Sequence, residues 1–347
     1  MGPSPIVDIG IAVIYIIMLA ISIPGNALIA LVIFKEAPLR TPMNLLVCNI
    51  AIASLLIGIM RVPFKIFSLM HFNMDYPFSV AMCQFQQLLP TAGVMVISLT
   101  LTTICVDRYI AIVHPLKKYL KLSKCRTTFL IFGYWMLSLA YFAPYASFNE
   151  LYEYQSRNYC IPIYPESPDD IVLTRNETTG KALSSIELSR LINWIFFGSL
   201  AFLIPALIMI VLYSKTIYTL WFSKAPCDRT QINIHHLQER LRKNRKAIKL
   251  LVACFLSFII FNTPYYTIFL LMDLKQLTID RAYSGILINI LIFFNYSSIA
   301  YNAIIYGYFN LSIRERILVA CKMSVRKASY RIISRFSKSE HLEISTV

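Results

Sequence analysis

The chain contains 347 residues, of which 57% are hydrophobic and 15% are charged, and its mean hydropathy is +0.60. This composition excludes a soluble domain and indicates a membrane protein. The net charge of +15 must therefore be divided between the two sides of a membrane before nucleic-acid binding is inferred from it.

Seven stretches are apolar over the roughly 20 residues that a helix needs to cross the hydrocarbon core of a bilayer. No segment shows the period-two series that is typical of an outer-membrane barrel. The pattern predicts an all-α membrane protein, a seven-transmembrane helix bundle forming one domain over residues 9–309. The predicted spans are residues 9–34, 43–70, 80–106, 127–148, 191–214, 250–272 and 282–309.

The segments between these spans carry their charges unevenly. Those on one side, including the tail, hold 25 Lys and Arg against 7 Asp and Glu, whereas those on the other side hold 6 against 11. Because basic residues accumulate on the cytoplasmic side, we expect an extracellular N-terminus over residues 1–8 and a cytoplasmic region over 310–347. We expect a multi-pass plasma-membrane protein whose basic face can also meet anionic lipid, with no nucleic-acid partner.

Short motifs stand at matching places in six of the predicted helices. They are Gly25-Asn26 in the first, Asp107-Arg108-Tyr109 in the third, Trp135 in the fourth, Pro205 with Tyr213 in the fifth, Phe258 with Pro264 in the sixth, and Asn302-Ala303-Ile304-Ile305-Tyr306 in the seventh. In these motifs the sequence resembles the rhodopsin-like family of G-protein-coupled receptors, over nearly its whole length.

The resemblance implies a receptor that binds an extracellular ligand and activates a heterotrimeric G protein. An arginine beside an acid at a helix end can be held by a local ion pair in one state and freed in another. By resemblance, Arg108 contacts an inserted G-protein helix, and Tyr213 and Tyr306 move inward as the sixth helix swings outward. The expected coupling and activation residues are Asp107, Arg108, Tyr109, Tyr213, Phe258, Asn302 and Tyr306.

The extracellular loops contain two cysteines and a glycosylation signal. Cys83 precedes the third helix and Cys160 lies between the fourth and fifth helices. Such a pair forms a disulfide in the resembled family, and both cysteines lie on the expected oxidising side. Residues 152–163 of the same loop favour a strand hairpin. Asn176, in Asn-Glu-Thr, is the predicted glycosylation site.

The segment after the seventh helix interleaves apolar and charged residues. The pattern predicts a short amphipathic eighth helix on the inner leaflet, in which Cys321 is either palmitoylated or simply apolar. Tail serines could be phosphorylated for an arrestin-type partner or remain unmodified. The terminal Ser-Thr-Val could bind a PDZ-type protein. Three residues at the expected start of the sixth helix resemble the basic lining of the G-protein cavity or are ordinary interfacial anchors: Arg245, Lys246 and Lys249.

Three positions depart from the family's pattern. Ser54 stands where relatives place an Asp in the second helix, so we expect no bound sodium ion. Asn262 occupies the position of the usual tryptophan of the sixth helix, so the aromatic toggle is missing. Ala303 replaces the usual proline of the seventh helix, which we expect to be less kinked. Melatonin receptors share this last form of the motif, as a local likeness only.

Rival functions lack the groups they require. Residues 282–309 contain no Lys for a retinal Schiff base. Away from the helix ends, the spans contain no acid for the proton relay of a transporter, which remains the alternative from another class. The five His have no metal-ligand spacing, so we expect neither an enzyme, nor a metal site, nor a cofactor. His235 and His236 are interpreted as part of a solvated loop.

The charged residues of the second and third predicted helices indicate the class of ligand. The third-helix stretch over residues 86–91 offers no acid for a cationic amine, whereas Arg61 and Lys65 share one face of the second helix. A peptide with an anionic group is the expected ligand, and an acidic lipid or small organic molecule is the alternative. Lys65 could instead reach the outer interface. The predicted ligand-binding residues are Arg61, Lys65, Gln87, Thr91, Tyr265, Tyr266, Phe269 and Tyr296.

Overall fold

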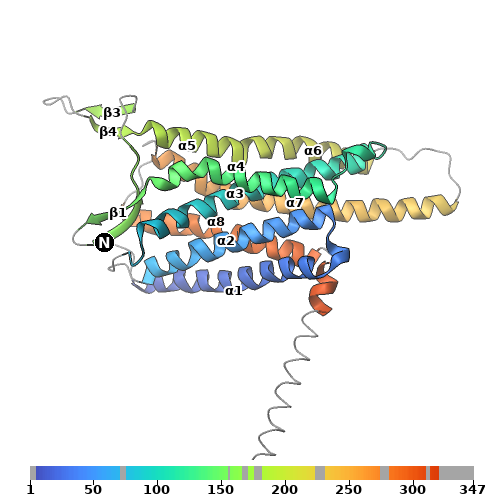
Figure 1. Cartoon of the computed structure of the whole chain (residues 1–347), viewed down its shortest axis with the longest axis horizontal. Coiled ribbons are helices and arrows are strands. Elements are labelled where there is room, and N and C mark those ends of the chain that lie inside the picture. The colour runs from blue at the N-terminus through green and yellow to red at the C-terminus, as the bar shows by residue number, and fades with distance from the viewer. Residues whose placement is uncertain are drawn as a thin grey trace, which may run out of the picture.

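The computed structural model describes residues 5–70, 76–154, 157–165, 171–175, 182–222, 231–273, 281–309 and 313–319. These residues contain seven helical spans long and apolar enough to cross a membrane, so the predicted seven-helix bundle is confirmed. The helices run side by side, and the start of α1 shares one end of the bundle with two strand hairpins (Figure 1).

Six spans are single helices, and the fifth consists of two helices joined by a π-helical turn. The third helix is central, because it packs against the second, fourth, fifth and sixth spans. The single helices are α1 (Pro5–Lys35), α2 (Pro42–Met70), α3 (Val80–Val113), α4 (Lys124–Ser147), α7 (Gln231–Asp273) and α8 (Arg281–Phe309). The fifth span is α5 (Leu188–Gly198), η3 (Ser199–Leu203) and α6 (Ile204–Phe222), and the 3-10 turns η1 (Ala37–Leu39) and η2 (Lys118–Leu120) lie between spans.

The helix α7 extends well beyond its predicted start at residue 250. It begins at Gln231 and projects past the other helices (Figure 1). The interpretation of His235 and His236 as loop residues is therefore wrong, and Arg245 lies within the helix rather than at its start. The segment 231–249 contains no Gly or Pro and is rich in good helix formers, so the helix continues after leaving the apolar region.

The π-helical turn η3 was not predicted, although its cause is visible in the sequence. Pro205 has no N–H to donate to the carbonyl of Ala201, four residues earlier. The hydroxyl of Ser98 in α3 donates to this carbonyl at 2.6 Å. A side chain of the central helix thus satisfies a backbone group near the disrupted turn and fastens the fifth span to α3.

The predicted hairpin is present over the outer end of the bundle. Strand β1 (Asn149–Tyr154) pairs antiparallel with β2 (Arg157–Pro162), and Leu151 lies opposite Cys160. A second antiparallel hairpin, β3 (Ile171–Arg175) with β4 (Ala182–Ile186), was not predicted. The expected disulfide joins Cys83 to Cys160, with 5.8 Å between their Cα atoms. It ties the first hairpin to the outer end of α3.

Removing this disulfide should destabilise the receptor. We expect Cys83→Ser or Cys160→Ser to lower the free energy of unfolding by about 2 to 5 kcal/mol, since a structural disulfide restricts the unfolded chain. Surface expression and thermal unfolding of the purified receptor measure the effect. Cys125→Ser is the matched control, because Cys125 is an exposed free thiol. Free alkylation of both Cys83 and Cys160 in the folded protein would contradict the prediction.

Buried amides fasten the helices that carry the sites. In α2, Asn49 donates from Nδ2 to Oγ1 of Thr100 at 2.9 Å, and its Oδ1 accepts from Nε1 of Trp135 at 2.9 Å. In α1, Asn26 donates to the carbonyl of Ile299 at 3.0 Å. These bonds give a role to two of the sequence motifs, because Trp135 helps to join α4 to α2 and α3, and Asn26 joins α1 to α8.

The expected eighth helix is present as a short helix over residues 313–319. Ile313 is fully buried, whereas Leu318 and Val319 are exposed. Arg316 lies 3.7 Å from Glu36 at the end of α1, which holds the short helix near the base of the bundle. Cys321 lies outside the described residues, so its palmitoylation stays a prediction.

Candidate ligand and coupling sites

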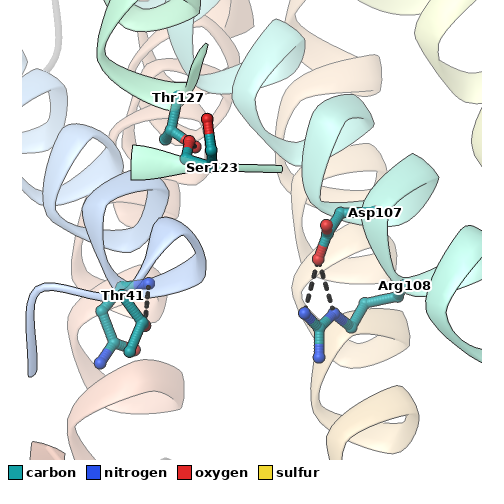
Figure 2. Close-up of polar contacts among 6 residues, drawn as sticks. Thr41, Asp107, Arg108, Ser123 and Thr127 are labelled. Atoms are coloured by element: carbon teal, nitrogen blue, oxygen red, sulfur yellow. Dashed lines mark hydrogen bonds and ion pairs between the residues drawn. The ribbon is translucent and has the colours of Figure 1, made fainter. Parts of the chain in front are cut away.

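Asp107 and Arg108 lie near the inner end of α3. The guanidinium of Arg108 donates to Oδ2 of Asp107 from Nη2 at 2.5 Å and from Nε at 3.2 Å. Figure 2 shows the two side chains folded onto each other, apart from Thr41, Ser123 and Thr127 at the starts of α2 and α4. Since Asp107 is buried and Arg108 is 30% exposed, the pair holds the arginine at the edge of the bundle. This is the local ion pair expected of a restrained state.

Four other predicted activation residues are buried in the bundle. Tyr213 and Tyr306 have 5% and 1% of their surfaces exposed, and Phe258 in α7 and Asn302 in α8 are also buried. Tyr213 contacts Cys105, and Tyr306 contacts Cys254. Tyr109 lies apart from them, with its hydroxyl 3.3 Å from Nε2 of His114.

Four of the predicted ligand residues come together around one cation. Nη2 of Arg61 donates to Oγ1 of Thr91 at 2.9 Å and to Oε1 of Gln87 at 3.4 Å. The guanidinium also reaches the hydroxyl of Tyr296 and lies close to Tyr266. We call Arg61, Gln87, Thr91, Tyr266 and Tyr296 the outer cluster. Every hydrogen-bond partner that the structure gives to Arg61 is neutral.

Lys65 lies one turn outward and has a different environment. The negative charge of Asp8 in α1 acts on its ammonium group, an influence that sequence spacing did not reveal, although no ion pair joins the two side chains among the described residues. No acid of the described part of the chain acts in this way on Arg61. The predicted aromatic side chains of α7 lie together, with ring centroids 4.9 Å apart for Tyr265 and Tyr266, and 4.4 Å apart for Tyr265 and Phe269.

Two cavities lie along α7. One, of about 490 Å³, lies between the fifth span and α7, and Tyr266 and Phe202 contribute to its largely apolar walls. The other, of about 560 Å³, lies at residues 241–249 of α7, away from the outer cluster. There Arg245 donates to the carbonyl of Leu220 at 2.9 Å and covers the ring of Trp221 at 5.1 Å, fastening α7 to α6. The remaining lining residues are Leu241, Arg242, Lys246 and Lys249.

A buried serine occupies the position in α2 at which members of the resembled family carry an acid. Ser54 is fully buried, and its Oγ has no hydrogen-bond partner among the described residues. Within this part of the chain, no cluster of His, Cys, Asp or Glu could hold a metal ion. A neutral hydroxyl alone cannot offset the dehydration of a sodium ion.

We therefore expect agonist affinity to be the same in sodium and potassium buffers of equal ionic strength. Radioligand competition in membranes measures it, once an agonist is available. Ser54→Asp is the converse variant, because it restores a carboxylate at this position and should introduce sodium sensitivity. A specific sodium effect on the parent receptor would contradict the prediction.

Comparison with known proteins agrees with this architecture. The model of the family described as 7 transmembrane receptor (rhodopsin family) matches residues 25–306. The chain belongs to the rhodopsin family of seven-transmembrane receptors. That family is one of receptors rather than enzymes, and its members include the rhodopsin-like G-protein-coupled receptors that the sequence motifs indicated.

Individual relatives cover most of the chain. The QRFP-like peptide receptor of Branchiostoma floridae is 27% identical over 334 residues, which are 96% of this chain and 83% of the relative. The human substance-K receptor is 28% identical, over 88% of this chain and 71% of the relative. Neuropeptide FF receptor 2 of Mus musculus is 25% identical, over 90% and 73%.

Proposed function

We propose that the receptor binds a peptide at its outer end and activates a heterotrimeric G protein at its inner end. Relatives named as receptors for QRFP-like peptides, substance K and neuropeptide FF support a peptide ligand. The two hairpins at the outer end, one of them tied to α3 by a disulfide, supply the backbone edges and aromatic side chains that can contact an extended chain.

The observation that carries the ligand proposal is the charge of Arg61. A cation inside a membrane-spanning bundle costs on the order of 3 kcal/mol, and neutral hydrogen bonds compensate this cost only in part. The hydrogen bonds of Arg61 to Gln87 and Thr91 leave its charge unbalanced. We infer that an anionic group of the ligand supplies the missing charge, either a peptide carboxylate or an acidic side chain.

The remaining predicted ligand residues are assigned to the walls of this site. Lys65 lies above Arg61, and Tyr265, Tyr266 and Phe269 form an aromatic wall on α7. Tyr and Phe provide large apolar contact areas at small entropic cost, which suits a ligand whose charged end is held deeper in the bundle. An acidic lipid or small organic acid would use the same cation with fewer contacts.

At the inner end, we assign G-protein contact to Arg108 and the basic residues of α7. Release of Arg108 from Asp107 would provide a planar donor group to an inserted helix. The charge distribution of the loops supports an extracellular N-terminus in the plasma membrane. Glycosylation at Asn176, palmitoylation at Cys321, and binding of arrestin or a PDZ-type protein involve segments outside the described residues and remain part of the proposal.

The proposal is tested by expressing the full chain in cells with G-protein dissociation sensors. Peptide and lipid libraries are applied in parallel to receptor-expressing and empty cells. We expect one or more peptides to give a sensor response in receptor-expressing cells and no response in empty cells. Responses to acidic lipids alone would overturn the peptide assignment, and specific substrate flux without any sensor response would overturn the receptor assignment.

A further inference from the structure

A hydrogen bond between two buried amides joins α7 to α8 where the usual tryptophan is missing. Nδ2 of Asn295 donates to Oδ1 of Asn262 at 2.9 Å, and Nδ2 of Asn262 donates to the carbonyl of Phe258 at 2.7 Å. Asn262 is 1% exposed and Asn295 is 5% exposed. Because a buried amide that loses its partner keeps its desolvation cost, this bond opposes separation of the two helices.

The amide pair is connected to the outer cluster. Tyr266 lies four residues after Asn262 and therefore on the same face of α7. Its side chain is hydrogen-bonded to Asn295 and lies near the charge of Arg61. Tyr296, which accepts from Arg61, directly follows Asn295 in α8. A ligand group that moves Arg61, Tyr266 or Tyr296 thus acts on the immediate neighbours of the amide bond.

The pair is also connected to the inner part of α7. The carbonyl that Asn262 holds belongs to Phe258, whose ring stacks on Phe202 of η3 with centroids 5.3 Å apart. One turn further inward, Cys254 is fully buried against Tyr306. Pro264 interrupts the backbone hydrogen bonds of α7 close to Asn262, so the helix is easiest to bend at this level.

We propose that the hydrogen bond between Asn262 and Asn295 holds α7 against α8 in the resting receptor, and that ligand contact at the outer cluster releases it. This inference rests on the proposed function and extends it, because it names the residue pair that transmits the signal. The two asparagines are positioning residues: they need not touch the ligand or the G protein. Their bond biases the equilibrium between a closed and an open arrangement of α7.

The position of α7 can be read without ligand or G protein, through the reactivity of Cys254. Outward movement of α7 should expose this thiol to N-ethylmaleimide, and peptide mapping by mass spectrometry reports its rate of alkylation. The full chain is purified into nanodiscs as the parent, as Asn262→Leu, as Asn295→Leu and as the double variant. Leu has the branched shape of Asn with bulkier methyl groups in place of the amide oxygen and nitrogen, so each change removes the hydrogen bond without leaving a cavity.

We expect either single variant to alkylate Cys254 about fivefold faster than the parent, which corresponds to the loss of one net hydrogen bond. The double variant should not exceed the faster single variant, because both changes remove the same bond. Cells with G-protein sensors should show a matching rise of ligand-independent activity. Ser297→Ala is the control, since Ser297 is also buried in α8 but bonds only within its helix, to Phe293.

The alkylation rate of Cys48 in α2 distinguishes the proposed movement of α7 from a general destabilisation of the bundle. It is a buried free thiol remote from the amide pair in the chain. A purely structural role of the asparagines would accelerate alkylation of Cys48 and Cys254 together, and this result would overturn the proposal. If the Leu variants fail to reach the membrane, Asn262→Ser and Asn295→Ser, which shorten the side chains but keep them polar, give the same comparison.

The outcomes also separate this inference from the proposed function. Faster alkylation of Cys254 alone, with no response of any G-protein sensor in parent or variants, would support the helix bond and contradict G-protein coupling. A G-protein response in the parent, with unchanged Cys254 alkylation in both single variants, would overturn the helix bond and leave the receptor function intact. Rates in the double variant equal to the product of the two single effects would show that the asparagines act independently, which also overturns the proposal.

Discussion

Arg108→Ala is expected to abolish ligand-stimulated nucleotide exchange while leaving ligand binding unchanged. Arg108 lies at the inner end of α3, far along this helix from Thr91, and its charge is held at the edge of the bundle by Asp107. Alanine removes the guanidinium group, which can donate several hydrogen bonds to a G-protein helix. Exchange should fall to the assay background, measured as GTPγS binding by G protein reconstituted with the receptor.

Asp107→Asn is the informative companion to this variant. It removes the charge that restrains Arg108 and leaves the arginine itself in place, so basal exchange should rise rather than fall. Opposite effects of the two substitutions would distinguish a releasable arginine from an anchoring one. Arg108→Ala with normal exchange at normal surface expression would contradict the assignment, and it would leave Arg108 with an anchoring role alone.

The bundle could be predicted because its determinants are local. Each span exceeds the length needed to cross a bilayer, and the hairpin residues favour strands, so both were found. The extent of α7 could not be inferred from hydropathy, since its inner half is polar and helical at once. The bond that fastens the π-helical turn to α3 could not be predicted either, because Ser98 is about a hundred positions away from the Ala201 carbonyl to which it donates.

The candidate sites were likewise predicted only in part from the sequence. Arg61 stood out because a charge within an apolar span is rare, and its neighbours Gln87 and Thr91 were found through the position of the third helix. The influence of Asp8 on Lys65 was missed, because Asp8 lies in a segment that was interpreted as an extracellular terminus rather than as the first turns of α1. The bond between Asn262 and Asn295 was also missed. The sequence shows that Asn262 replaces the usual tryptophan, but it does not show which residue of another helix pairs with this asparagine.

The absence of the tryptophan also changes how the receptor can respond. An aromatic toggle responds to a ligand through ring packing, whereas the amide pair responds through hydrogen bonds that are either made or broken. Phe202 and Tyr266, whose ring centroids are 4.5 Å apart, keep an aromatic route to Phe258 beside the polar one. If the proposed contact of an anionic ligand group with Arg61 holds, the charge of the ligand acts on both routes, because Arg61 lies near Tyr266.

Arg61→Gln is therefore expected to lower agonist potency by about tenfold to a hundredfold, which corresponds to the loss of a charge-assisted hydrogen bond of roughly 1.5 to 3 kcal/mol. Gln keeps a polar group that can still bond to Thr91, so surface expression should not change. Lys65→Gln is the matched control, and its loss should be smaller because the negative charge of Asp8 already acts on Lys65. The measurement is a dose-response curve with the peptide found by the sensor screen.

The ligand itself supplies the decisive comparison. Each acidic group of the peptide is neutralised in turn, by amidation of its C-terminus or by exchanging Asp for Asn and Glu for Gln, and each analogue is assayed on both receptors. If Arg61 binds one of these carboxylates, the corresponding analogue should lose as much potency on the parent as Arg61→Gln loses with the parent peptide. The two changes together should then cost no more than one of them alone, since both remove the same bond. Equal potency on parent and Arg61→Gln receptors would contradict the assignment. If the potency losses from the receptor change and the peptide change add fully for every analogue, the anionic group of the ligand binds a cation other than Arg61.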